Sequence, residues 1–452
     1  MRIIIIGAGE VGFHIAGRLV AEEKEVVFID KDQEVLDRLS DRLDVETVCG
    51  SGSTPQVLES AGIKTADMLM AVTDSDEVNI IACTFSNILA PDLTRVARVR
   101  NPDYSSYKDT LARSLKIDIV VNPEDEVVEA IELLLNAPGA VEINQFSDVK
   151  VQMAAIWVRE NSWISGMDMS RLKASVGTVG FIVAAIIREN SVIIPKGSDS
   201  LRPGDLMYFV CSEKDLSAIL KSFGVSTGIW NRVMIIGGGK IGFKLAKSLE
   251  KRKGVALKIV DLNRERCDFL AEHLSGAIVL HGDGRDRDLL QEENVRDMDV
   301  VISLTGDEEN NILCSLLVKS LGAANTVTRI DKFAYLPLMQ ALGLENIVSP
   351  RQATANSILR YVRQGKVISS ISIKEEAEVM EVIIEEGSAI ADKSLKELDF
   401  PKGSIVVCQV RGQEIIIPSG QSVLRPKDRV MILSTRKKIP AVEKMLTRKQ
   451  KD

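Results

Sequence analysis

Two segments carry residues suited to binding phosphate, and their glycines have the same spacing. One lies at the start of the chain and the other near its middle. Residues 2–12 read RIIIIGAGEVG, and residues 232–242 read RVMIIGGGKIG. In each, an apolar strand pattern leads into G-x-G-x-x-G, where the backbone can turn tightly and approach a pyrophosphate at the start of a helix. The residues expected to face the phosphates are Gly7, Ala8, Gly9, Glu10, Val11 and Gly12, and Gly237, Gly238, Gly239, Lys240, Ile241 and Gly242.

An acidic residue ends the next predicted strand in both copies. Asp30 and Asp261 each follow their fingerprint by about 20 residues, where an acid can reach a ribose hydroxyl. One G-x-G-x-x-G is weak evidence, but two copies in the same strand, helix and acid context indicate two mononucleotide or dinucleotide sites. Because an acid here repels a 2′-phosphate, NADP(H) should bind worse than NAD(H).

The similarity between the two halves extends well beyond the fingerprints. TDSDEVN at residues 73–79 corresponds to TGDEENN at residues 305–311, and Arg98 corresponds to Arg329. Agreement across separated segments indicates an internal duplication.

The elements that must hold these residues alternate between strand and helix, with the last helix of the first half expected at residues 104–115. Such alternation predicts a parallel doubly wound sheet that binds its ligand at the carboxyl ends of the strands. The strands expected in the first half are residues 3–6, 26–29, 45–49, 68–72, 95–99 and 117–121.

A smaller unit follows each predicted sheet. Both contain a hairpin pattern, an L-R-P-x-D turn, a strand and an amphipathic helix. The fold class is therefore α/β, with two Rossmann-like doubly wound parallel-sheet domains, each followed by a small α+β C-terminal domain. The expected domains, alternately nucleotide-binding and C-terminal, are residues 1–137, 142–226, 231–364 and 368–452.

Composition is typical of a soluble globular protein. Of the 452 residues, 45% are hydrophobic and 27% charged, and a net charge of −7 argues against a nucleic-acid partner. The six cysteines show no C-x-x-C spacing, which favours reduced thiols in a cytoplasmic protein over disulfides or zinc. The basic segments at residues 436–438 and 448–451 could touch anionic lipid, although a solvated face is the simpler interpretation.

Residues suited to catalysis are sparse. The three histidines all fall inside the nucleotide-binding halves, and no Walker motif, nucleophile elbow or H-E-x-x-H is present. The acidic runs at residues 74–77 and 307–309 could hold a divalent ion, but we favour acids that complement a helix start and predict no metal site. Two nucleotide sites without catalytic residues indicate a sensor and not an enzyme.

Together these features closely resemble, over nearly the whole chain, the duplicated regulator-of-potassium-conductance (KTN) family of Trk potassium-uptake systems. The segment SPRQAT at residues 349–354 adds to the likeness. The resemblance implies a cytosolic homo-oligomer, a dimer or tetramer, that binds NAD(H) and ATP or ADP as a gating ring. It also implies docking at the inner face of the membrane under a separate potassium-translocating subunit of the TrkH/TrkG type.

Carried over by position, the resemblance implies further ligand-facing residues. Ser51 stands opposite Asp283, and a hydroxyl cannot accept two hydrogen bonds as a carboxylate does, so base recognition in the first unit departs from the family pattern. The implied residues are Thr73, Asp74 and Arg98 in the first unit, and Asp283, Thr305, Gly306 and Arg329 in the second.

The two helix starts differ in charge. Glu10 and Lys240 occupy the position where phosphate groups arrive, so we expect the second unit to tolerate ATP and the first to prefer NAD(H) or ADP. If both side chains point to solvent, the two sites are alike.

Two other functions stay open: an NAD-dependent oxidoreductase, and a nucleotide-sensing subunit of another transporter or channel.

Overall fold

The chain forms two compact units, Met1–Glu126 with Pro350–Val362, and Val127–Ser349 with Arg363–Asp452, which are described separately. The predicted domain ends at residues 226, 364 and 452 and the basic segment at 448–451 lie outside the described residues. The structure, a computed structural model, describes residues 1–146, 149–177, 180–189, 191–225, 228–332, 335–359, 367–373 and 376–447.

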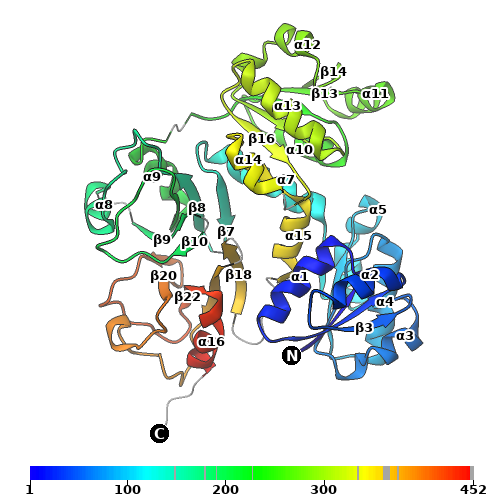
Figure 1. Cartoon of the computed structure of the whole chain (residues 1–452), viewed down its shortest axis with the longest axis vertical. Helices are drawn as coiled ribbons and strands as arrows, with labels where there is room; N and C mark the ends of the chain where they lie inside the picture. Colours follow the sequence, from blue (N-terminus) through cyan, green and yellow to red (C-terminus); the bar gives the residue numbers. More distant parts are fainter. Residues whose placement is uncertain are drawn as a thin grey trace. The chain divides into compact units, whose positions relative to one another are not determined.

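The first unit, whose first 126 residues are drawn from blue to cyan in Figure 1, is built on a six-stranded parallel sheet of order β3-β2-β1-β4-β5-β6. The order reverses between β1 and β4, the place where doubly wound sheets bind ligands. The sheet confirms the fold class predicted for this half. Its strands are β1 (Arg2–Ile6), β2 (Glu25–Asp30), β3 (Glu46–Cys49), β4 (Met68–Ala71), β5 (Thr94–Arg98) and β6 (Ile119–Val121).

Polar caps start several of the helices around this sheet. Asp32 accepts from the backbone of α2, and Ser75 accepts from Val78 N at the start of α4. The single helix expected at residues 104–115 is instead two, because Asn101 caps an earlier start and the chain turns at Ser106 and Tyr107. The helices are α1 (Glu10–Ala21), α2 (Gln33–Ser40), α3 (Pro55–Ser60), α4 (Asp76–Leu89), α5 (Pro102–Ser105) and α6 (Lys108–Ser114).

The second unit contains a sheet of the same topology, order β14-β13-β12-β15-β16-β17, which agrees with the duplication read from the sequence. Its strands are β12 (Arg232–Ile236), β13 (Ala256–Asp261), β14 (Ala277–His281), β15 (Val300–Ser303), β16 (Thr326–Arg329) and β17 (Asn346–Val348). Its helices are α10 (Lys240–Leu249), α11 (Arg264–His273), α12 (Arg287–Glu292), α13 (Glu308–Ser320) and α14 (Leu336–Ala341).

Two small antiparallel sheets, both in the second unit, follow the parallel sheets in sequence and share one topology, β10-β9-β11-β8-β7 and β18-β19-β22-β20-β21. The first comprises β7 (Glu142–Gln145), β8 (Val151–Trp157), β9 (Phe181–Arg188), β10 (Ser191–Ile193) and β11 (Leu206–Ser212), with helices α8 (Met169–Ser175) and α9 (Leu216–Ser222). The second comprises β18 (Val367–Ile373), β19 (Ala377–Ile383), β20 (Ser404–Arg411), β21 (Glu414–Ile416) and β22 (Arg429–Thr435), followed by α16 (Ile439–Thr447).

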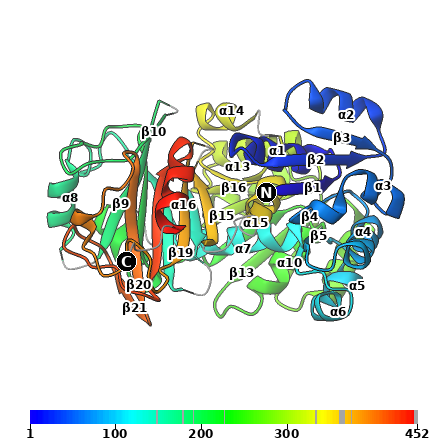
Figure 2. The same cartoon turned by 90° about the horizontal axis from the view of Figure 1, so that it is seen from below.

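The two small sheets pack against each other in one apolar core. Met153 and Tyr208 of the first sheet lie in the same buried cluster as Val379 and Met431 of the second. Figure 2 shows the strands of both sheets side by side. The duplicated C-terminal domains therefore form a pair within a single chain.

One helix after each parallel sheet belongs to the other half of the fold. Helix α15 (Pro350–Leu359) follows the second sheet in sequence but packs against α1, with Ile358 buried in the core of the first sheet. Helix α7 (Pro123–Asn136) follows the first sheet, yet its Glu132 accepts a hydrogen bond from Ser248 of α10. The predicted second nucleotide domain extends to residue 364 and so includes α15, and the domain boundaries stay a prediction.

The described helices include none that is both long and apolar enough to cross a membrane. All six cysteines are unpaired, with Cys49 exposed and the other five buried.

Candidate functional site

The ligand-facing residues predicted for the first unit all lie at the carboxyl edge of its parallel sheet. The fingerprint follows β1, Asp30 ends β2, and Arg98 ends β5. Thr73 and Asp74 lie between β4 and α4, across the switch point from the fingerprint. The second unit places its predicted residues at the equivalent edge.

The fingerprint glycines are required by backbone geometry. Gly7 has a φ of +105°, and a Cβ at this residue would lie 3.0 Å from Thr73 N. A Cβ at Gly12 would lie 2.1 Å from Gly7 O, well inside van der Waals contact. The same constraints recur at Gly237, with a φ of +104°, and at Gly242, where the distance is 2.0 Å. These four positions therefore hold the turn that joins strand to helix.

The middle glycine of each fingerprint leaves open space instead. Gly9 and Gly239 are the N-cap residues of α1 and α10, and neither supplies a side-chain cap. Among the described residues, no heavy atom beyond the chain neighbours lies within 4 Å of a Cβ built at either glycine. The start of each helix is thus open to an anionic ligand.

The two strand-end acids make matching contacts with the fingerprint. Asp30 Oδ2 accepts from Ala8 N at 2.7 Å, and Asp261 Oδ2 accepts from Gly238 N at 2.7 Å. In each acid the other oxygen accepts from the backbone two residues further on. Because a carboxylate oxygen has two lone pairs, both acids can still accept from ribose hydroxyls.

A buried asparagine braces the threonine loop in each unit. Thr73 donates to Asn79 Oδ1 from its N–H at 3.0 Å and from Oγ1 at 2.8 Å, and Asn79 Nδ2 donates to Arg98 O at 2.8 Å. Thr305 and Asn311 repeat the pattern at 2.8 and 2.7 Å. Sequence reasoning did not count either asparagine among the site residues, although both stood in the repeated segments that it compared.

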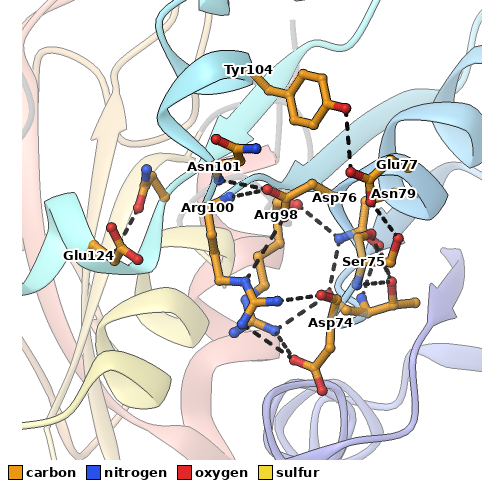
Figure 3. A network of polar contacts seen from close by, with 12 residues as sticks. Asp74, Ser75, Asp76, Glu77, Asn79, Arg98, Arg100, Asn101, Tyr104 and Glu124 are labelled. Carbon is orange, nitrogen blue, oxygen red and sulfur yellow. Dashed lines mark hydrogen bonds and ion pairs between the residues drawn. The ribbon is translucent and has the colours of Figure 1, made fainter. Parts of the chain in front are cut away.

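In the first unit, Asp74 pairs with two arginines at the edge of the site (Figure 3). Its Oδ1 lies 3.0 Å from Arg98 Nη1 and 3.8 Å from Arg100 Nη1. The Asp74 side chain is 91% exposed whereas that of Arg98 is 14% exposed. Burial, together with the neighbouring charge of Arg100, lowers the pKa of Arg98. A ligand phosphate could therefore replace the exposed carboxylate on a preformed guanidinium pair.

The rest of the acidic run in the first unit supports the start of α4. Asp76 Oδ2 accepts from Arg100 N at 2.9 Å and from Asn101 N at 2.6 Å. Glu77 accepts from Ser75 Oγ and from Tyr104 Oη, and hydrogen bonds from its backbone and from Ser75 lower its pKa (Figure 3). These contacts agree with the helix-start interpretation of the run.

The arginine of the second unit has a different partner. Gly306 stands where the first unit has Asp74, and Arg329 Nη2 lies 2.9 Å from Asp331 Oδ2. Arg329 also donates to Thr305 O at 3.3 Å. Both units thus hold an arginine at this edge, paired with an exposed acid in the first unit and with a less exposed one in the second.

The Gly-Asp turn differs between the units as the sequence indicated. Asp283 forms a two-point ion pair with Arg285, at 3.0 Å to Nε and 2.8 Å to Nη2, and these hydrogen bonds lower the pKa of Asp283. In the first unit Ser51 Oγ lies 2.8 Å from Ser53 Oγ. A hydroxyl pair therefore replaces an ion pair beside the strand-end acid.

Two basic residues near the fingerprints were not foreseen. Arg351 Nη1 of α15 lies 3.2 Å from Glu10 Oε2, so Glu10 does not face a phosphate as an isolated carboxylate. In the second unit, Arg266 donates to Gly238 O and to Gly239 O. Arg351 lies in the SPRQAT segment, but no local pattern connects that segment to Glu10.

Comparison with known families matches the whole duplicated layout. The TrkA-N domain matches residues 3–123 and 233–350, and the TrkA-C domain matches residues 153–224 and 379–447.

Full-length relatives have the same extent as this chain. The Trk system potassium uptake protein TrkA homolog 1 of Methanosarcina mazei is 38% identical over 451 residues, which cover 98% of this chain and 99% of that protein. The Trk system potassium uptake protein TrkA of Halomonas elongata is 37% identical, with 98% of each chain covered.

Solved structures of the GsuK RCK domain and of the GsuK channel share the fold. The GsuK RCK domain superposes with a TM-score of 0.60 at 18% identity, covering 98% of this chain and 94% of that one. The GsuK channel bound to NAD gives a TM-score of 0.61, also at 18% identity, covering 98% of this chain and 78% of that one.

Proposed function

Since the chain belongs to the TrkA family of Trk system potassium uptake proteins, we propose that it is the nucleotide-binding regulatory subunit of a potassium uptake transporter. In this role it gates potassium flux through a separate membrane subunit of the TrkH/TrkG type. It acts as a homo-oligomer at the cytoplasmic face of the membrane. The chain binds nucleotide and changes potassium flux in response, and it does not catalyse a reaction.

The observation that carries this proposal is the repetition of one ligand-binding geometry. Each half presents an open helix start beside its middle fingerprint glycine, and a strand-end acid that keeps free lone pairs. An arginine paired with an acid completes each edge. A site of this kind takes a ligand with a ribose and a charged phosphate group.

Regulatory ligands of the class NAD(H), ATP and ADP fit these sites. Structures of GsuK bound to NAD and bound to ADP, the latter with a TM-score of 0.50 at 16% identity, belong to proteins of the same fold. The open fingerprint accommodates phosphates of either ligand. Asp30 and Asp261 disfavour a 2′-phosphate, so NAD(H) is the preferred dinucleotide.

Regulation requires that a ligand bind two conformations of the protein unequally. Each site spans the junction between β1 and β4, or between β12 and β15, so a ligand contacts helix and loop on both sides of the switch point. When a phosphate replaces Asp74 as the partner of Arg98, an ion pair between the end of β5 and the loop before α4 is broken. The contacts of β5 and of α4 therefore change at the same time. Such a local change is the signal that the assembly passes to the membrane subunit.

The function can be tested by co-purification, followed by a measurement of potassium flux. A multi-span potassium transporter subunit should copurify with the affinity-tagged chain, and potassium flux of the reconstituted pair should change when NAD(H), ATP or ADP is added. A variant chain with both Asp30→Ala and Asp261→Ala should still copurify but lose the response. Steady oxidation or reduction of nicotinamide with a substrate would instead favour an oxidoreductase.

A further inference from the structure

The helix start of the first site carries an ion pair whose two partners come from opposite halves of the sequence. Glu10 is the first residue of α1, and Arg351 is the second residue of α15. Their side chains meet at 3.2 Å between Oε2 and Nη1. Because α15 packs along α1 through buried Ile358, the guanidinium is held beside the fingerprint.

The second site obtains its basic group in a different way. Arg266 of α11 lies over the Phe269 ring, with the guanidinium carbon 4.4 Å from the ring centroid, and donates to two fingerprint carbonyls. Val35 occupies the equivalent position in the first half. The basic side chain beside the fingerprint therefore comes from the same half in the second site and from the other half in the first.

We propose that Arg351 completes the first nucleotide site and makes it favour a nucleoside triphosphate over a diphosphate, a role that rests on the proposed function. Phosphate oxygens at the start of α1 attract the guanidinium and repel the Glu10 carboxylate. The Arg351–Glu10 ion pair therefore breaks, and Arg351 pairs with the ligand phosphate instead. This preference is opposite to the one expected from Glu10 alone. Phosphate charge bound by the first half then acts directly on a helix of the second half.

The ion pair is also placed where exchange is possible. The Arg351 and Glu10 side chains are 35% and 62% exposed. An exposed pair is worth little to stability because water and salt screen it, so a multiply charged ligand can replace the carboxylate at small cost. The apolar packing of Ala355 and Ile358 keeps α15 in place while the guanidinium changes partner.

The test compares ATP and ADP binding at the first site alone. Calorimetric titrations use the full chain with Asp261→Ala, which weakens the second site so that the first is titrated as the tighter class of site. In that background, Arg351→Gln should lower the affinity for ATP roughly three- to tenfold and the affinity for ADP much less. Arg351→Lys should keep part of the preference. Glu10→Gln removes the internal partner and should raise the affinity for ATP.

Asn356→Ala is the matched control on the same helix. It removes the hydrogen bond that Arg18 Nη1 donates to Asn356 Oδ1 at 3.0 Å, another polar contact between α1 and α15. The ratio of ATP to ADP affinity should not change in this variant. If Arg351→Gln and Glu10→Gln also leave the ratio unchanged, Arg351 only docks the helix and the inference is overturned. If the parent chain binds neither nucleotide, the proposed function itself fails and the inference fails with it.

Discussion

At the scale of single residues, Asp30 and Asp261 make the same contact with their fingerprints, so each should control one site. Replacing either by Ala removes the acceptor for the ribose hydroxyls while the other half keeps its own acid. Hydrogen bonds to a charged group contribute about 1.5–3 kcal/mol, so affinity at the altered site should fall roughly ten- to a hundredfold. Calorimetry with NAD(H) should show one unchanged class of site in each single variant.

Asp32→Ala is a suitable control for the Asp30 variant. Asp32 caps α2 by accepting from Glu34 N at 3.0 Å, so its loss should weaken the helix start by about 1 kcal/mol and leave ligand affinity nearly unchanged. Unchanged stoichiometry and affinity in both the Asp30→Ala and Asp261→Ala chains would show that the acids do not hold the ribose.

At the scale of elements, the L-R-P-x-D turns lock onto the preceding hairpin through a buried carboxylate. Asp428, 1% exposed, accepts from Arg425 N at 2.6 Å and forms a two-point ion pair with Arg411 at 2.9 Å. The other copy repeats this arrangement with Asp205 and Arg188 at 2.8 and 2.7 Å. The L-R-P-x-D motif therefore forms a turn and also fixes that turn to a strand of the sheet through its aspartate.

Replacing Asp428 by Asn should destabilise the second C-terminal domain in a pH-dependent way. Burial alone raises the pKa of Asp428, but hydrogen bonds from Arg411, Arg425 N and Gln409 outweigh it and hold the pKa below its usual value. The stabilisation is therefore present above the unfolded pKa of about 4 and is lost as pH falls through the lower folded pKa. We expect a loss of about 2–3 kcal/mol at pH 7.

Urea unfolding followed by circular dichroism at pH 7 and at pH 3.5 measures this effect. The difference between the parent chain and Asp428→Asn should be large at pH 7 and smaller at pH 3.5. The exposed acid Asp399 of the same domain gives a control, since Asp399→Asn should behave as the parent does at both values. An equal difference at the two pH values would contradict the charge-based explanation.

Local conformation explains which elements could be predicted from the sequence. The fingerprints were predictable because the φ of Gly7 and the close contact of Gly12 leave no other residue type. The place of α15 was not, because its sequence shows no marked apolar face that would indicate which surface it covers. The Glu10–Arg351 pair depends on that placement and was missed for the same reason. The break at Ser106 also lay within a continuous helical pattern.

At the scale of the whole molecule, the exchanged helices make the two halves interdependent. Ile358 and Ala355 of α15 are fully buried in the core of the first sheet, so the second half of the sequence contributes part of that core. The paired C-terminal sheets share a core in the same way.

Exposed apolar side chains lie on α4 of the first half and at one equivalent position on α13 of the second, where the described residues leave them uncovered. Ile81 and Ile88 lie on one face of α4 with exposures of 43% and 68%, and Leu313 of α13, at the position equivalent to Ile81, is 54% exposed. Apolar side chains that recur at equivalent helix positions mark a surface for self-association. We expect a second copy of the chain to cover these helices in the proposed homo-oligomer.

The double variant Ile81→Asp with Ile88→Asp tests this surface, because burying two carboxylates in an apolar interface is strongly unfavourable. In sedimentation velocity at micromolar concentration, the parent chain should run above the monomer mass and the variant should shift towards it. Nucleotide binding should persist, since neither residue contacts the fingerprint. Ile229→Asp, at an exposed position between domains, should sediment as the parent does. A parent chain that stays monomeric with and without nucleotide would count heavily against the gating ring, whereas an oligomeric variant would place the interface elsewhere.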